Sequence, residues 1–182
     1  MALFRTNSAA VSGLEALVID VEVDLYAGVK QEFFTVGVPA LAMHEGGKRI
    51  KSALISSGYG YPTRSVFIKL VPAGIREEWA SFDLPIAIGI LIAMGVVRQS
   101  QNHLFVGELS RNGELRPIRG ALSIVASARS SGIRNLLLPA DNATEVSGVE
   151  GVDVFGARNL TEAVQIVNAH DGLAPQALTE RA

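Results

Sequence analysis

The sequence predicts an α+β domain (α/β two-layer), with helices packed on a sheet around one core. Residues 17–25 carry an apolar side chain at every odd position, which is the period of a half-buried strand. Residues 84–97 are apolar on almost every side of a helix, so this helix is expected at the centre of the core. Beyond residue 103, apolar strands alternate with helices, whereas the first part is strand-rich and antiparallel.

Turn and capping signals divide the first half of the chain into elements. Pro39 is expected to open a helix that ends at Ser57, with Gly58 as its stop, although two adjacent glycines weaken the middle of this helix. Asp83 is expected to be the N-cap of the central helix. The strands expected before this helix cover residues 2–12, 17–25, 33–38 and 65–71.

The second half is organised around Asn112-Gly113, a strong hairpin signal between two apolar strands. Asn142 is expected to cap a short helix. The other elements expected here are strands over 104–109, 114–118, 136–139 and 152–155, and helices over 120–131 and 159–168. A single domain is therefore expected over residues 1–170, followed by a linker or tail over 171–182.

Composition restricts the class of protein. Of the 182 residues, 48% are hydrophobic and 19% charged, which is typical of a chain with a sizeable core. The absence of cysteine removes disulfides, thiolate metal sites and cysteine nucleophiles, and it fits a reducing compartment. The longest apolar run is shorter than the roughly 20 residues that span a bilayer, and the first residues do not resemble a signal peptide. We expect a cytoplasmic protein with no membrane partner.

Charge gives only a weak indication of nucleic-acid binding. The net charge is −2, whereas a domain that binds nucleic acid alone usually has a basic excess. Two groups of basic residues could still contact phosphate, and solvated helix faces account for them equally well. The first group is Lys48, Arg49 and Lys51, and the looser second group is Arg116, Arg119, Arg129 and Arg134.

No complete catalytic or metal motif is present. The acidic face formed by Asp20, Glu22 and Asp24 is expected to be solvated, because a hard-cation site needs ligands from several elements. His44, His103 and His170 are widely spaced and form no known ligand motif. The Gly-x-x-x-x-Gly-Lys-Ser/Thr loop that cradles nucleotide phosphates is absent, so this chain is not expected to bind ATP tightly.

Ser81 is the candidate nucleophile. It precedes the central helix, where free backbone N–H groups could stabilise an oxyanion. A serine also needs an adjacent base to act as a nucleophile. The alternative, an ordinary serine at a helix entry, is favoured until such a base is found.

Several segments together resemble one bacterial family. They are Ser-Phe-Asp-Leu-Pro-Ile-Ala-Ile-Gly-Ile-Leu at 81–91, Val-Gly-Glu-Leu-Ser at 106–110, Gly-Glu-Leu-Arg-Pro-Ile-Arg-Gly at 113–120, Leu-Leu-Leu-Pro-Ala-Asp-Asn at 136–142, Val-Glu-Val-Asp at 21–24 and Val-Gly-Val-Pro at 36–39. Over about residues 1–170 the chain is similar to the N-terminal domain of the magnesium-chelatase-like AAA+ ATPases, the YifB and competence protein ComM family. This resemblance implies a Lon-protease-like domain with the fold of ribosomal protein S5 domain 2.

The resemblance also implies what the site residues are. Lon-type proteases use a serine and a lysine; Ser81 stands at the serine position and Leu122 at the lysine position. Leucine accepts no proton, and Lys69 and Arg119 are the nearest candidates to replace the lysine. Phe82 adds bulk where the protease has alanine. The resemblance therefore implies a degenerate site with no catalytic residue, in which Ser81 is vestigial.

Three functions remain open on these grounds. The first is a non-enzymatic accessory domain that contacts DNA, a partner protein or neighbouring subunits; the resemblance implies an adjoining ATPase module that holds ATP and Mg, a hexameric ring, and DNA branch migration in competence. The second is a residual serine peptidase using Ser81. The third is a DNA-binding module in its own right. Around residues 44–49, the family's acidic-basic run is replaced by His-Glu-Gly-Gly-Lys-Arg, so a contact made by that helix is expected to differ here.

Overall fold

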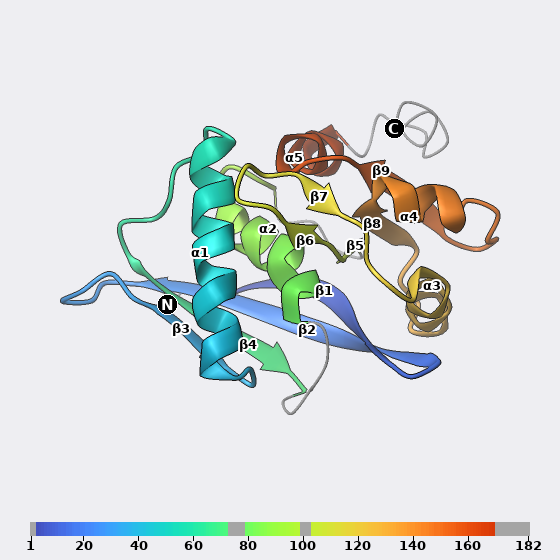
Figure 1. Ribbon diagram of the computed structural model, residues 1–182, viewed down its shortest axis with the longest axis horizontal. Helices are drawn as coiled ribbons and strands as arrows, with labels where there is room; N and C mark the ends of the chain where they lie inside the picture. The colour runs from blue at the N-terminus through green and yellow to red at the C-terminus, as the bar shows by residue number, and fades with distance from the viewer. Residues whose placement is uncertain (1–2, 73–78, 99–102, 170–182) are drawn as a thin grey trace.

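A computed structural model describes residues 3–72, 79–98 and 103–169. Within them the chain forms a seven-stranded sheet of order β3-β4-β2-β1-β5-β8-β9 and a separate pair, β6-β7 (Figure 1). The strands are β1 (Leu3–Ser12), β2 (Glu15–Tyr26), β3 (Phe33–Val36), β4 (Ser65–Val71), β5 (His103–Phe105), β6 (Glu108–Leu109), β7 (Leu115–Arg116), β8 (Asn135–Pro139) and β9 (Asp153–Ala157). The helices are α1 (Ala40–Ser56), α2 (Asp83–Ala93), α3 (Ala121–Ser130), α4 (Ala140–Glu145) and α5 (Leu160–Ala169), with a 3-10 turn, η1 (Trp79–Phe82), before α2.

The sheet is mixed and mostly parallel. β1 and β2 form an antiparallel hairpin around Gly13, whose φ of 62° suits a two-residue turn, and β2 pairs antiparallel with β4. β3 pairs with β4 in parallel, because α1 lies between them in sequence and acts as a crossover. β5, β8 and β9 continue the sheet in parallel. The α/β class is therefore confirmed. The expectation that the strands of the first half are all antiparallel is wrong for the edge strand β3, which runs parallel to β4.

Helices cover both faces of the sheet, rather than forming the expected two layers. One buried cluster joins α1, α2 and α5 to one face, and a second joins α3 and α4 to the other (Figure 1). β8 shows the cause, because Leu137 belongs to the first cluster while Leu136 and Leu138 belong to the second. A strand that is apolar on both faces must be covered on both.

The central helix is confirmed. Every residue of α2 from Asp83 to Ile92 is buried. Gly89 allows the close approach of this helix to β2, since a Cβ at that position would lie 2.5 Å from the Val23 Cγ2. The end of α1 is also as expected: Gly58 has a φ of 87°, and the Tyr59 N–H donates to the Leu54 carbonyl in a Schellman-type stop.

Three local predictions are wrong. Asp83 is the first residue of α2 and not its cap, because its side chain is used in an ion pair. Asn142 lies inside α4, where its side-chain amide accepts the Ile118 N–H and donates to the Ile118 carbonyl. The strand expected over 104–109 is split into β5 and β6, because Gly107 leaves the sheet to bond with the segment before α2.

Two further expectations concern a membrane-spanning helix and the C-terminal tail. None of the helices in the described ranges is both long and apolar enough to cross a bilayer. The tail expected over 171–182, together with His170, lies outside the described residues, so the domain boundary at residue 170 stays a prediction.

Candidate functional site

Ser81 lies in a packed corner at the entrance to α2. It is 9% exposed and belongs to η1, which packs against α1, α2 and β6. Its carbonyl accepts the Gly107 N–H at 2.9 Å, and the Leu84 N–H donates to the Gly107 carbonyl at 3.0 Å. One of the first N–H groups of α2 is therefore already used, which weakens the proposed oxyanion site. A Cβ at residue 107 would lie 2.7 Å from the Leu115 Cδ2, so a larger residue there would displace the end of that leucine side chain.

Leu122 occupies a different environment. It is 57% exposed on α3 and lines a groove of about 490 Å³ with the β1–β2 turn, whereas Ser81 is not among the lining residues. The groove is held together by the Ser123 hydroxyl, which donates to the Leu14 carbonyl at 2.9 Å. Ser81 and Leu122, which the resemblance assigns to the serine and lysine positions, thus lie in separate surroundings, one packed under α1 and one open to solvent.

The two residues that could replace the lysine are exposed as well. Lys69 lies on β4 between Ile68 and Leu70, which are buried in the cluster that contains α2. Because successive side chains of a strand point to opposite faces, Lys69 projects from the face away from α2. Arg119 is exposed in the loop before α3. Neither position suits a base for Ser81.

Asp83, two residues after Ser81, forms a buried ion pair. The Arg49 Nε lies 2.9 Å from the Asp83 Oδ2, and the Arg49 Nη2 donates to the Asp83 Oδ1 at 3.2 Å. The side chains of Asp83 and Arg49 are 1% and 22% exposed. The Leu109 N–H also donates to the Asp83 carboxylate, at 3.2 Å. Burial raises the pKa of Asp83 to about 7, although the hydrogen bond from Arg49 opposes this rise. The pair therefore ties α1, α2 and β6 together.

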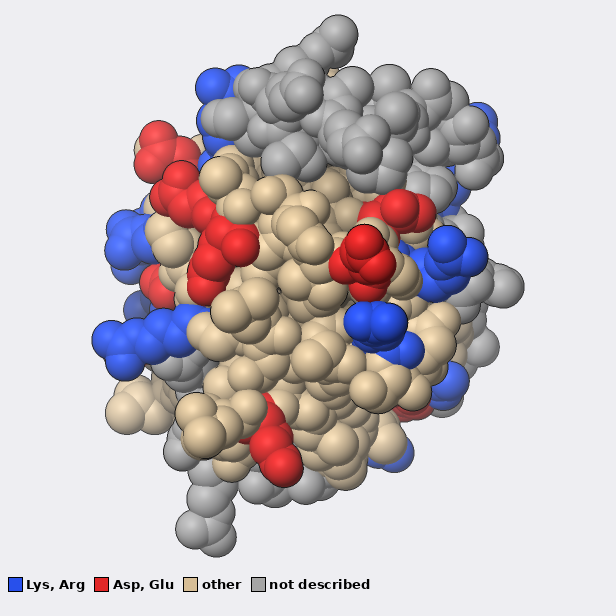
Figure 2. Space-filling view, turned by 90° about the vertical axis from the view of Figure 1, so that its right-hand side faces the viewer, with Lys and Arg blue, Asp and Glu red and all other residues tan. Residues whose placement is uncertain are grey.

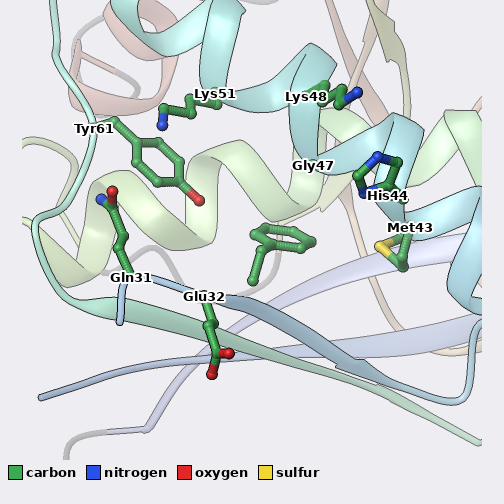
Figure 3. Close-up of a pocket in the computed structure, with 9 residues that line it drawn as sticks. Gln31, Glu32, Met43, His44, Gly47, Lys48, Lys51 and Tyr61 are labelled. Carbon is green, nitrogen blue, oxygen red and sulfur yellow. The ribbon is translucent and has the colours of Figure 1, made fainter. Parts of the chain in front are cut away.

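The first basic group is divided by the structure. Arg49 points to Asp83, so it is not an available phosphate ligand, contrary to the sequence prediction. Lys48 and Lys51 lie on another side of α1, and both are exposed. With His44 they follow the i, i+4, i+7 spacing that places side chains along one helix face. This face borders a cavity of about 240 Å³ (Figure 3).

The cavity lies between α1 and the loop that leads into β3. The Lys51 ammonium group is 5.2 Å from the centre of the Tyr61 ring, within cation–π range. Gly47 allows the Phe33 ring to pack directly on α1, because a Cβ at residue 47 would lie 3.2 Å from the Phe33 Cδ1. The residues that line the cavity are Gln31, Glu32, Phe33, Met43, His44, Gly47, Lys48, Lys51 and Tyr61.

The second basic group does not form a continuous surface. Arg116, Arg119, Arg129 and Arg134 are all exposed. Figure 2 looks onto the side of the molecule that carries α3 and α4, where the basic groups are separated by acidic groups and by a broad uncharged area. Among the described residues visible on this side there is therefore no basic stripe of the kind that is typical of phosphate-driven binding.

The acidic face on β2 is less solvated than expected. Arg5 lies 2.9 Å from the Glu22 carboxylate and 3.9 Å from that of Asp20, while Asp24 is buried at 7% exposure. Among the described residues, no group of three or more His, Cys, Asp or Glu side chains could hold a metal ion.

Sequence reasoning missed the Arg49–Asp83 pair and the cavity beside Tyr61. A signal for the pair was present, because a charged residue that opens a wholly apolar helix must find a buried partner. The spacing of His44, Lys48 and Lys51, which places them on one face of a helix, could also have been recognised in the sequence. That Gln31 and Tyr61 line the cavity could not be predicted from the sequence around them, because it depends on how two loops pack against α1.

The sequence of the chain is similar to those of several known proteins. Residues 21–142 match the sequence profile of the family described as subunit ChlI of Mg-chelatase. The chain is 36% identical over 177 residues to competence protein ComM of Haemophilus influenzae, covering 95% of this chain and 34% of ComM. It is 36% identical over 153 residues to YifB of Escherichia coli, covering 83% of this chain and 30% of YifB. A shorter stretch of 92 residues is 25% identical to Lon protease 2 of Bacillus subtilis, covering 50% of this chain and 17% of that protease.

Proposed function

Because the chain belongs to the family of the ChlI subunit of Mg-chelatase, we propose that it is the non-catalytic N-terminal accessory domain of a Mg-chelatase-like AAA+ ATPase that serves DNA processing. The observation that carries this proposal is the pattern of coverage. The chain spans about a third of the length of ComM and YifB, yet those matches cover 95% and 83% of it. The sequence contains no Walker-type phosphate loop, so the ATP and Mg of such an ATPase belong to another module.

In this proposal the domain contacts DNA, a partner protein or neighbouring subunits of a hexameric ring. The DNA role is supported by the name of competence protein ComM, which matches along nearly the whole chain. The finer fold assignment, a Lon-protease-like domain with the fold of ribosomal protein S5 domain 2, is supported by the similarity to Lon protease 2. The loss of activity is supported by Leu122 at the lysine position and by its separation from the packed surroundings of Ser81.

The 182-residue chain alone is expected to hydrolyse no ATP above the rate of a buffer control. The physical reason is that phosphate binding needs a loop of convergent backbone N–H groups followed by a lysine, which this sequence lacks. Phosphate release with Mg-ATP measures the rate. Turnover that survives repurification would contradict a non-catalytic role. The coding sequence downstream of Ala182 gives an independent check, since a Walker loop is expected there.

A residual Lon-like peptidase is the second candidate, favoured by the serine at residue 81 and the similarity to Lon protease 2. We expect a serine-reactive fluorophosphonate to leave the chain unlabelled, because Ser81 is 9% exposed and the position that the resemblance assigns to the lysine holds Leu122. Labelling is followed by intact mass, with Ser81→Ala as the matched control. Labelling that disappears in Ser81→Ala would establish the peptidase instead.

A further inference from the structure

The cavity beside Tyr61 has the size of a site for one flat ring. Its volume is about 240 Å³, whereas sites for drug-sized ligands are roughly 300–1,000 Å³. Two aromatic side chains, Phe33 and Tyr61, line it together with the thioether of Met43. Such walls suit a planar group that can stack, and they supply little that would select between planar groups.

Positive charge gathers around this cavity although the chain as a whole has a net charge of −2. Lys48 and Lys51 line it, and Lys30 and Arg64 are exposed on the two loops beside it. These loops are tied together at Ser65, whose hydroxyl donates to the Lys30 carbonyl at 2.8 Å and accepts the Glu32 N–H at 3.1 Å. The hydrogen bonds of Ser65 thus connect the two loops that carry Lys30 and Arg64.

The acidic and titratable groups of the lining do not cancel this charge. Figure 3 shows the Glu32 carboxylate pointing away from Lys51 and the Tyr61 ring. Burial raises the pKa of Tyr61 to about 12, so its hydroxyl stays neutral at physiological pH. The cavity therefore combines aromatic surfaces with two exposed cations, Lys48 and Lys51, and the Lys51 ammonium lies 5.2 Å from the centre of the Tyr61 ring.

We propose that this cavity binds one unstacked base of a single-stranded nucleic acid, with Lys48 and Lys51 contacting the neighbouring phosphates. The inference rests on the proposed function and deepens it by naming the site of nucleic-acid contact. A base inside a duplex is stacked on both faces and cannot enter a cavity of this size, which is why single strands are favoured. An accessible base next to a phosphate occurs in single-stranded DNA, in single-stranded RNA and in a free nucleotide.

Fluorescence anisotropy of the 182-residue chain with labelled oligonucleotides tests the site. The probes are oligothymidylate and oligouridylate of about 20 nucleotides and a duplex of equal length, measured at about 50 and 200 mM salt, with thymidine monophosphate as competitor. We expect single strands to bind at least about fivefold more tightly than the duplex, and the free nucleotide to compete poorly. Preference between DNA and RNA identifies the natural source.

Variants separate the base contact from the phosphate contacts. Lys48→Ala with Lys51→Ala is expected to weaken binding about tenfold at low salt and to reduce the salt slope by roughly 0.7 per lost phosphate contact. Tyr61→Leu is expected to weaken binding about fivefold or more at both salt concentrations without changing the slope, whereas Tyr61→Phe retains it. Lys69→Ala is the matched control, because it removes an exposed lysine on the opposite face of the sheet.

A cross-linking readout keeps the inference testable if Tyr61→Leu fails to fold. An oligonucleotide that carries 5-iodouracil is expected to cross-link the wild-type chain at Tyr61 or Phe33. Cross-links found only elsewhere, or single-strand binding that the lysine variant leaves unchanged, would overturn this site while leaving the proposed accessory role intact. Equal binding of duplex and single strand would overturn it too. No binding to any probe would overturn both the site and the DNA-contacting form of the proposed function.

Discussion

Arg49→Met is expected to lower the free energy of unfolding by about 3 kcal/mol near pH 8. The substitution leaves the Asp83 carboxyl, 1% exposed, without the guanidinium that lies 2.9 Å away. A carboxylate buried without a partner must either remain charged in a poor environment or take up a proton, and both cost free energy. Urea denaturation followed by circular dichroism measures the change.

The pH dependence identifies the cause of this loss. The wild-type pKa of Asp83, about 7, lies above the roughly 3.9 of an unfolded aspartate, so the carboxyl takes up a proton on folding between these values. Its contribution to stability therefore increases as pH falls from about 7 to about 4. Removing Arg49 raises the folded pKa further, because Arg49 lowers it. The deficit of Arg49→Met is thus expected to grow as pH rises above about 7 and to be smaller near pH 5.5.

Two further variants control for this interpretation. Arg158→Met breaks an exposed pair with Glu162 on α5, 2.8 Å in length, and is expected to have little effect. Arg49→Met combined with Asp83→Asn is expected to recover most of the loss, because the amide oxygen can still accept the Leu109 N–H. A deficit that is independent of pH, or a double variant as unstable as Arg49→Met, would contradict the ion-pair explanation.

Phe82→Ala is expected to cost about 3–5 kcal/mol of unfolding free energy. Phe82 is completely buried and lies 6.2 Å from the Trp79 ring, centre to centre. Truncation removes most of a large apolar side chain and leaves a cavity next to α2. The Phe82 side chain, next to Ser81, is thus part of the hydrophobic core, and blocking an active site is not its only effect.

The same variant tests the degenerate-site interpretation. Phe82→Ala restores the alanine expected from the resemblance to Lon, yet it is expected to gain no fluorophosphonate labelling, because Leu122 still stands at the lysine position. Phe34→Ala serves as the stability control, since Phe34 is 45% exposed on β3. A loss below about 1 kcal/mol, or labelling of Ser81 in the variant, would contradict this prediction.

Regular elements could be predicted where the local pattern was strong. The odd-position apolar residues of 17–25 gave β2, and the apolar stretch from Leu84 to Ile92 gave the buried α2. Asn112-Gly113 was a sound hairpin signal, although the paired strands β6 and β7 are short. Caps were predicted less well, because Asp83 and Asn142 are used in contacts with distant segments.

Only some residues of the candidate site could be predicted from the sequence. Lys48 and Lys51 were identified with Arg49 as one basic group, but Arg49 turns to a partner 34 residues away. Ser81 was identified from its place before the central helix and then from the resemblance, whereas the exposed setting of Leu122 required the structure. Gln31 and Tyr61 could not be found, because nothing in their own neighbourhood marks them as lining residues.

By itself, the sequence determined the α/β class, the family and the absence of a phosphate loop, because each of these depends on residue types at short, regular spacing. Only the tertiary structure decided that helices cover both faces of the sheet, that Asp83 pairs with Arg49, and that Ser81 and Leu122 lie in separate surroundings. These are contacts between segments far apart in the chain, and they are selected by packing of the whole core. The local period of a segment can show that it is buried, but it does not specify which distant segment packs against it.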